Sequence, residues 1–189
     1  MISGKRASKW VVNALMGLFV ASAVVLIAVK FAVGWYWTIP QNGMYPTLPA
    51  GSTFFGINKP YRDVKGVKRG DIVIFERFEG GSRYIYIWRV VGLPGDAVEI
   101  DDARVTLNGK GLPQEKVRSE GGYEIFRETN GDASYEVAYE GKVSEGLPRT
   151  LTLTVPDDHL FVLGDNRQNA SDSRRMGPIR FDSVVAKKW

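Results

Sequence analysis

Residues 10–29 constrain this chain most, because all of them are apolar or small except Asn13 and Ser22. A helix of this length, at about 1.5 Å of rise per residue, is roughly 30 Å long, which matches the hydrocarbon core of a bilayer. The segment is therefore predicted to be a transmembrane helix.

Charged and aromatic residues around this segment predict its orientation. Lys5, Arg6 and Lys9 precede it, and residues 1–37 contain no acidic side chain. The positive-inside rule then keeps the N-terminus in the cytoplasm and places the rest of the chain outside. The aromatic run 35–37 suits the outer membrane interface.

A cleaved secretory signal is the alternative interpretation, with the small residues 32–34 as its cleavage site. We rank it lower for two reasons. The apolar run exceeds the ~7 to 15 residues of a signal-peptide core, and Lys30 lies between the run and the proposed site.

Charge and composition exclude several classes of function. Four of the 25 basic residues lie in residues 1–37, so the remaining 21 face all 21 acidic residues and leave no basic surplus for nucleic acid. The absence of cysteine excludes disulfides, a cysteine nucleophile and thiolate metal sites. With a single histidine as well, neither a metal site nor a cofactor is expected.

The part after residue 37 is predicted to be mainly β. Short β-branched and aromatic runs alternate there with Gly, Pro, Asn and Asp, and no long 3.6-residue period occurs. Residues 93–96 predict a type II turn, and Asn108-Gly109 predicts a tight hairpin. The predicted strands are 53–57, 71–76, 84–91, 97–100, 105–107, 123–127, 135–139, 150–155 and 159–163.

The chain is predicted to have three parts. Residues 1–37 form the cytoplasmic N-terminus and the anchor. Residues 38–100 and 150–189 close on each other as a β core. Residues 101–149 have a different texture, with Gly pairs and many charges, and are predicted to be an inserted hairpin-rich lobe.

Four separated stretches, in this order, match one family. They are GMYPTL (43–48), RGDIVIF (69–75), RVVGLPGD (89–96) and GDNRQNASDSRRMGPI (164–179). Together with the anchor they resemble the sequence boxes of bacterial type I signal peptidases. The resemblance implies an antiparallel β protease domain on the outer face of the cytoplasmic membrane, which cuts signal peptides from exported preproteins.

The family uses a Ser nucleophile and a Lys general base, and this chain departs from the pattern at both positions. Gly43 stands at the Ser position, and Trp88 stands at the Lys position. Two supporting positions differ as well, because Gln41 replaces a Ser that helps to hold the oxyanion and Ala170 replaces a Ser that orients the Lys amine. No catalytic residue is therefore predicted to be intact.

The rest of the pattern is retained. The resemblance implies substrate-binding positions at Gln41, Asn42, Met44, Pro46 and Ile87. The scaffold residues that stay on pattern in the last box are Asp165, Arg167, Asp172, Ser173, Arg174 and Gly177. Asp172 and Arg174 are expected to form a buried ion pair that braces this box.

The substitutions remove the chemistry that peptide hydrolysis by this route needs. Glycine offers no nucleophile, and an indole only donates a hydrogen bond and cannot act as a base. Loss of such a unit costs about 10⁶ in rate, or roughly 8 kcal/mol of transition-state stabilisation. We expect the Trp88 ring to fill the space opposite Gly43, and the Gln41 amide could still face an oxyanion.

No other residue is spaced to replace the missing pair. The candidate hydroxyls and amines are better explained as turn caps or solvated charges, and His159 as a structural residue at the start of a strand. These candidates are Thr47, Ser52, Thr53, Ser171, Ser173, Lys59, Lys65 and Lys68.

Three functions remain open from the sequence. The first is a pseudo-peptidase that binds exported preproteins or pilin-like peptides, assists assembly of a surface structure, or regulates an active signal peptidase paralogue. The second is an active signal peptidase with unconventional machinery. The third is an inert subunit of a membrane complex. Binding is ranked first, because main-chain hydrogen bonding of an extended peptide needs no catalytic residue.

Overall fold

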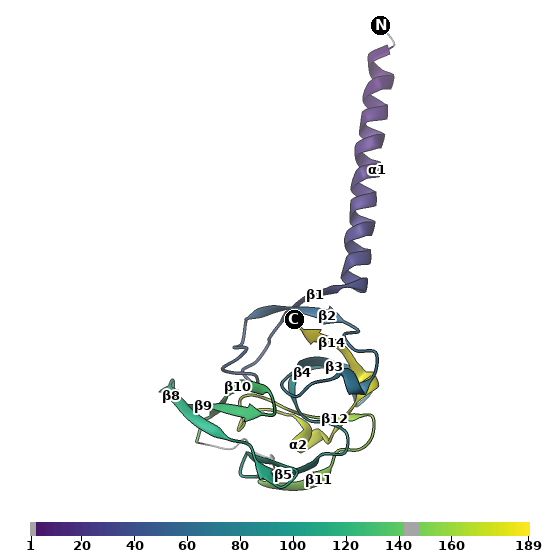
Figure 1. The fold of residues 1–189 in the computed structure, drawn as a ribbon. Helices are drawn as coiled ribbons and strands as arrows, with labels where there is room; N and C mark the ends of the chain where they lie inside the picture. The colour runs from purple at the N-terminus through teal and green to yellow at the C-terminus, as the bar shows by residue number, and fades with distance from the viewer. Residues whose placement is uncertain (1–2, 142–147) are drawn as a thin grey trace.

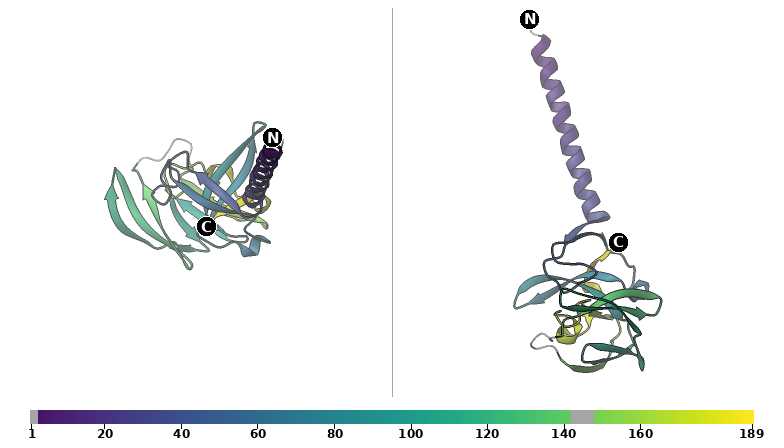
Figure 2. Two further views of the ribbon diagram at one scale, coloured as in Figure 1. Left: turned by 90° about the horizontal axis from the view of Figure 1, so that it is seen from above. Right: turned by 90° about the vertical axis from the view of Figure 1, so that its left-hand side faces the viewer.

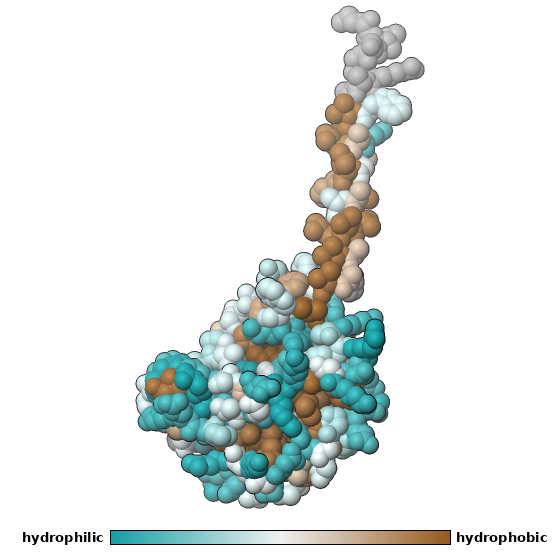
Figure 3. All heavy atoms as spheres, in the orientation of Figure 1, coloured by the Kyte–Doolittle hydropathy of each residue, from teal (hydrophilic) through white to brown (hydrophobic). Residues whose placement is uncertain are grey.

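The computed structural model describes residues 3–141 and 148–189. A long helix, α1 (Ser3–Ala32), projects from a β body, and the C-terminus lies near the base of this helix (Figure 1). Residues 9–29 of α1 are apolar enough and long enough to cross a membrane, and none of this stretch is buried against the rest of the chain. Figure 3 shows the resulting apolar column above a largely hydrophilic body. The helix is thus a candidate membrane span, as the sequence predicts.

A seven-stranded antiparallel sheet forms the centre of the body, with the strand order β1-β2-β14-β3-β4-β12-β13. Its first and last strands in the chain, β1 and β14, lie on either side of β2, so the segment that leaves α1 joins the same sheet as the C-terminus. The strands are β1 (Gly34–Thr38), β2 (Thr53–Asn58), β3 (Ile72–Glu79), β4 (Ser82–Gly92), β12 (His159–Leu163), β13 (Ile179–Arg180) and β14 (Val184–Lys188).

Two smaller sheets complete the body. One has the order β11-β5-β6-β7 and the other β10-β9-β8. Their strands are β5 (Ala97–Asp101), β6 (Arg104–Leu107), β7 (Lys110–Gly111), β8 (Gln114–Glu120), β9 (Tyr123–Asn130), β10 (Ala133–Tyr139) and β11 (Thr150–Thr154). Seen from above, the green strands of the three-stranded sheet lie on the side of the body away from α1 (Figure 2, left). Short helical segments are η1 (Val64–Gly66), α2 (Ser173–Met176) and η2 (Phe181–Ser183).

Alternating apolar residues build two cores. The larger core lies on the seven-stranded sheet and includes the fully buried Val73 and Phe75 of β3. The smaller core joins β4 and β12 to the four-stranded sheet through Val91, Val98 and Phe161. β4 and β12 therefore carry side chains for both cores, which holds the loops at their ends in place.

The prediction of a mainly β chain is confirmed, and every predicted strand is present, β12 with the predicted bounds and the others with one or both ends shifted. Three longer strands were not predicted: β1, β8 and β14. Both predicted turns are confirmed, because Gly95 has φ +85° with a 3.0 Å hydrogen bond from Asp96 N–H to the Leu93 carbonyl, and Asn108 and Gly109 both have positive φ. Part of the predicted lobe, residues 142–147, lies outside the described residues.

Candidate functional site

The loop between β1 and β2 places Gly43 against β4 of the seven-stranded sheet. Met44 is buried in the larger core, and its carbonyl accepts a hydrogen bond from Leu48 N–H at 2.8 Å. The Asn42 side chain accepts a hydrogen bond from Ala50 N–H at 2.9 Å. These contacts close the loop on itself and fix the position of Gly43 between two anchored neighbours.

The three-stranded sheet also contacts this loop. The Tyr45 hydroxyl donates a hydrogen bond to Glu120 at 2.6 Å, and the ring of Tyr45 packs on Tyr123 with 4.7 Å between centroids. The hydrogen bond to Glu120 raises the pKa of Tyr45. The β8–β9 hairpin therefore supports the loop through Tyr45.

Trp88, on β4, fills the space that faces Gly43. A Cβ atom added at Gly43 would lie 2.5 Å from Cη2 and 2.6 Å from Cζ3 of the indole ring. Trp88 is only 3% exposed, so this contact is inside the protein. Any side chain at position 43 would require the indole to move, which explains why Gly and Trp occur together.

Gly164, in the last box, also packs closely against Gly43 and Trp88. A Cβ atom added at Gly164 would lie 2.5 Å from the Gly43 carbonyl oxygen and 3.1 Å from Cζ3 of Trp88, and would overlap Cβ of Ala170. Positions 43, 88 and 170, which the sequence singles out as departures from the family pattern, are therefore packed around one point. Gln41 is exposed beside them.

A small hollow of about 40 Å³ lies next to this point. Of the predicted substrate-binding residues, Gln41, Met44 and Ile87 line it, whereas Asn42 and Pro46 do not. Sequence reasoning did not single out four of its residues, although each lies within four residues of a box: Ile39, Pro40, Ile85 and Tyr86. Small-molecule pockets usually enclose about 300–1,000 Å³, so the hollow can accept a single small group.

β4 offers a free backbone edge beside the hollow. β3 pairs with β4 from Ser82 to Arg89, but β12 pairs only with Arg89, Val90 and Gly92. Because Val90 N–H donates to the Asp71 carbonyl on the β3 side, alternation directs the backbone groups of Ile87 and Ile85 away from β3. In the described part of the chain, no strand pairs with this edge between Ser82 and Trp88.

Two buried ion pairs lie next to the site. Arg89 donates to both carboxylate oxygens of Asp165 at 2.7 and 2.6 Å. Asp172 accepts from the Arg174 guanidinium at 2.9 and 2.7 Å and from Gly164 N–H at 3.0 Å. The predicted Asp172–Arg174 pair is thus present and buried, and it fixes Gly164 behind Gly43.

Arg167 pairs with Glu128, a residue of β9 that no sequence motif indicates. Both side chains are buried, and the guanidinium donates to Glu128 Oε2 at 2.8 Å and also contacts Oε1. Burial alone raises the pKa of Glu128, but attraction to Arg167 and hydrogen bonds from Arg167, Gln114 and Tyr135 lower it below its ordinary value. The pair therefore stays ionised and joins the three-stranded sheet to the last box.

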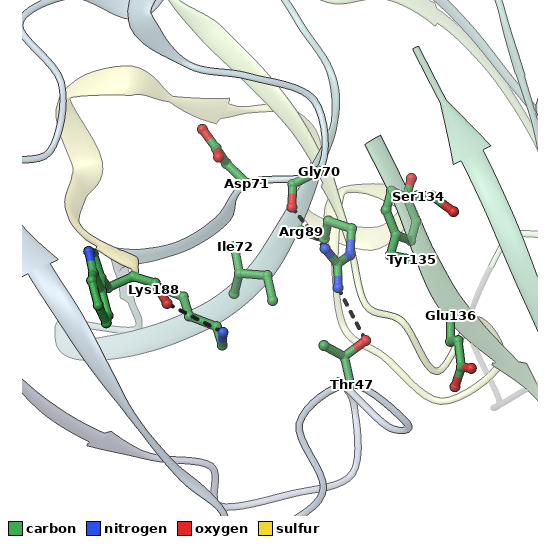
Figure 4. A pocket seen from close by; sticks show the side chains of 10 residues that line it. Thr47, Gly70, Asp71, Ile72, Arg89, Ser134, Tyr135, Glu136 and Lys188 are labelled. Atoms are coloured by element: carbon green, nitrogen blue, oxygen red, sulfur yellow. Dashed lines mark hydrogen bonds between the residues drawn. The ribbon is translucent and has the colours of Figure 1, made fainter. Parts of the chain in front are cut away.

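A larger open pocket of about 500 Å³ lies where Arg89 of β4 meets Tyr135 of β10, and its arginine is already hydrogen-bonded (Figure 4). The Arg89 guanidinium points into it, donating to the Gly70 carbonyl at 2.8 Å and to Thr47 Oγ1 at 3.2 Å. It also stacks 4.2 Å above the Tyr135 ring. Thr47, a candidate replacement nucleophile, thus accepts a hydrogen bond from Arg89.

Ser52, Ser173 and His159 are likewise placed against nearby backbone groups. Ser52 Oγ donates to the Pro49 carbonyl at 2.6 Å, and Ser173 Oγ accepts from Val162 N–H at 2.9 Å. His159 begins β12 and its Nδ1 lies 2.8 Å from the Asp157 carbonyl oxygen. Lys59, Lys65 and Lys68 are exposed.

Metal chemistry finds no support in the described residues. Within 3–141 and 148–189, no group of three or more His, Asp or Glu side chains is arranged to hold a metal ion.

Comparison with known proteins gives a consistent result. The family model described as "Signal peptidase, peptidase S26" matches residues 10–188. The chain is 34% identical over 167 residues to signal peptidase I of Pseudomonas fluorescens, covering 80% of this chain and 58% of that protein. It is 32% identical over 166 residues to signal peptidase I V of Bacillus subtilis (strain 168), covering 88% of this chain and 90% of that protein.

Among solved structures, a signal peptidase I from Enterococcus faecalis V583 matches with a TM-score of 0.39 and 29% identity. This match covers 64% of this chain and 94% of that chain. The chain thus spans nearly the whole Bacillus relative but only 58% of the length of the Pseudomonas fluorescens relative.

Proposed function

Because this chain belongs to the peptidase S26 family of signal peptidases, we propose that it is a catalytically silent, membrane-anchored member that binds an extended exported peptide. The observation that carries the proposal is the Trp88 ring, which occupies the space in front of Gly43. A nucleophile and a base are both missing at the positions where the family pattern has them.

The chemistry of the site supports a complete loss of peptidase activity rather than weak activity. Attack on a peptide carbonyl needs a hydroxyl that can transfer its proton to a neutral amine. Glycine supplies no hydroxyl, and the indole nitrogen of Trp88 has no lone pair for a proton. The nearby hydroxyls of Thr47 and Ser173 are bound by Arg89 and by the backbone of β12.

The free edge of β4 supports peptide binding. An added strand would hydrogen-bond to the outward backbone groups of Ile85 and Ile87. Its side chains would then alternate between the hollow and solvent. Neither interaction requires a catalytic residue, so binding can persist after catalysis is lost.

Location and partners follow from the same proposal. The N-terminus is cytoplasmic and the β body lies on the periplasmic or extracellular side, because Lys5, Arg6 and Lys9 precede the span. The ligand is an exported preprotein or a pilin-like peptide that reaches the same membrane face. Through such a ligand the protein assists assembly of a surface or pilus structure, or acts beside an active signal peptidase paralogue.

Site-specific photo-crosslinking in cells tests this proposal. A photoreactive residue replaces Gln41, which is exposed at the hollow, and a matched variant carries it at the exposed Glu99 of β5. We expect a crosslinked exported polypeptide from position 41 and none from position 99. Equal labelling at both positions, or none at position 41, contradicts peptide binding and favours an inert subunit.

A further inference from the structure

Most outer strands of the three sheets are protected against pairing with another chain. β7 and β13 contain only two residues each. β8 carries charged side chains and a bulge, and β10 is bridged to the last box through Ala138 and Asn166. β1 lies at the base of α1, where the membrane surface is expected (Figure 1). Short length, charge, bulges and coverage by other segments are the features that keep strand edges from pairing.

β11 is the remaining outer strand, and it has none of these protections. Its residues are Thr-Leu-Thr-Leu-Thr, with no charge, proline or glycine. In the described part of the chain, β5 is the one strand that pairs with it. β11 lies at the end of the body opposite α1, so the bilayer does not cover it (Figure 1). Its outer edge is therefore open to another chain.

The hydrogen bonds to β5 show which backbone groups of β11 point outward. Val155 N–H, just after the strand, donates to the Asp96 carbonyl on the β5 side at 2.9 Å. By alternation, the odd-numbered residues bond to β5 and the even-numbered residues direct their N–H and C=O groups away from the sheet. The outward residues, all exposed, are Thr150, Thr152 and Thr154. β11 thus presents a row of backbone donors and acceptors along its outer side.

The strand reads the same in both directions, so a second copy of β11 is complementary to it. In an antiparallel register centred on Thr152, this residue faces its own counterpart, and Thr150 faces Thr154. Each facing threonine pair exchanges two backbone hydrogen bonds. Leu151 faces Leu153 of the other copy, and both leucines are only half-buried against the smaller core. A two-fold interface requires a patch that is complementary to itself in this way.

The charges at the two ends of the strand match as well. Arg149 directly precedes β11 and Asp157 follows it, and both side chains are exposed. Within the described residues, neither forms an ion pair. The register centred on Thr152 places Arg149 of each copy diagonally opposite Asp157 of the other, which is within reach of a long side chain. Opposite charges therefore meet at both ends of the paired strands.

We propose that β11 is a dimerisation strand, through which two copies of this chain pair antiparallel about a two-fold axis at Thr152. The pairing joins the two four-stranded sheets into one continuous sheet. The inference goes beyond peptide binding and does not depend on it, because β11 belongs to a different sheet from β4 and does not line the hollow beside Gly43.

A single introduced cysteine tests the two-fold axis directly, because the chain contains no cysteine of its own. Facing residues of a hydrogen-bonded antiparallel pair have Cα atoms about 5.5 Å apart, which a disulfide can span. We expect Thr152→Cys in the full-length protein to give a disulfide-linked dimer when isolated membranes are mildly oxidised. Glu99→Cys is the matched control, because Glu99 is exposed and pairs with Thr152 from β5, one strand further from the axis.

A second experiment removes one backbone donor from the outer edge. Thr152→Pro deletes an outward N–H and leaves the hydrogen bonds to β5 intact, since proline is tolerated where the N–H of an edge strand faces away from the sheet. The dissociation constant of the dimer should rise about tenfold or more. Thr152→Val keeps the N–H and should leave it unchanged. Light scattering of the full-length protein in detergent measures the association, and melting temperatures show whether both variants fold.

The outcomes decide between a second copy and another occupant. A linked dimer from position 152 alone, together with weaker association of a folded Thr152→Pro variant, supports the proposal. No linked dimer, equal yields from positions 152 and 99, or unchanged association of Thr152→Pro overturns it. A disulfide-independent adduct of β11 with a different polypeptide, in place of the dimer, also overturns it. Peptide binding at β4 is measured separately and stands or falls by its own test.

Discussion

Two regions that meet at Gly43 differ in what the chain has kept. On one side, Gly43, Trp88 and Ala170 form an apolar contact where the family pattern has hydroxyl and amine groups. On the other side, buried ion pairs of Arg89, Arg167 and Arg174 remain complete. The same polypeptide therefore has small and apolar residues at positions 43, 88 and 170 next to complete buried ion pairs.

The difference has an energetic reason. Removing one partner of a buried ion pair leaves an unpaired charge, which costs about 3–5 kcal/mol. Replacing a Ser and a Lys by Gly and Trp leaves no charge in the core. The buried pairs therefore stabilise the fold whether or not positions 43, 88 and 170 carry reactive groups.

The largest effect is expected from restoring the catalytic set. The variant Gly43→Ser, Trp88→Lys, Ala170→Ser returns a nucleophile, a base and the residue that orients the base. Such a unit contributes up to about 10⁶ in rate, and its members act together. We therefore expect a preprotein to be shortened by the triple variant and not by Gly43→Ser alone, measured by gel mobility in single-turnover assays. A folded triple variant without activity would show that the residues around these three positions can no longer support peptide hydrolysis either.

Breaking one buried ion pair tests whether these pairs stabilise the fold. Arg167→Met leaves Glu128 buried without its positive partner, and the free energy of unfolding should fall by about 3–5 kcal/mol. Arg180→Met, which breaks an exposed pair with Asp182, is the control and should leave stability unchanged. Denaturant unfolding in detergent measures both. Similar stability of the two variants would contradict the structural role assigned to Arg167.

The contact between Gly43 and Trp88 can be measured as a coupling energy. Gly43→Ala places a methyl group against the indole and should cost about 1–3 kcal/mol, and much less in a Trp88→Leu background. Gly111→Ala is the control, because its added Cβ meets only Thr106 Oγ1 at 4.0 Å. Equal costs of Gly43→Ala in both backgrounds would mean that the ring does not occupy this space.

A smaller effect is expected from pH. Burial raises the pKa of Asp96, but hydrogen bonds from Arg69, the Leu93 N–H and Asn108 outweigh it and lower the pKa below its ordinary value. A lowered pKa gives stability that is present above the unfolded pKa near about 4 and is lost as pH falls through the folded value. Asp96→Asn should therefore flatten the fall in melting temperature between about pH 5 and pH 3. An unchanged slope would assign acid unfolding to other carboxylates.

Much of the fold could be predicted because local patterns and tertiary contacts agree. The apolar helix, the alternating strands and both turns follow from residue type and spacing. β8 could not be predicted, since its charged side chains leave no apolar face and it is an edge strand. β1 could not be predicted as a strand, because its aromatic residues suit a membrane interface equally well.

The sequence predicts the site residues that the family pattern marks and misses those that lie far from every box. Positions 43, 88 and 170 were singled out by comparison with the family pattern, and the structure packs them around one point. Glu128 was missed because it lies 39 residues from Arg167, in a strand outside every box. Nothing in local sequence indicates that a single buried carboxylate there completes the last box.

The most direct test is a single-turnover incubation of the unmodified full-length protein, in molar excess, with a purified preprotein. The prediction is that the preprotein keeps its full length while remaining bound. A shortened product, formed by the protein itself and abolished by one point substitution in the loop of residues 43–48, would show that a working attacking group exists and would contradict the account.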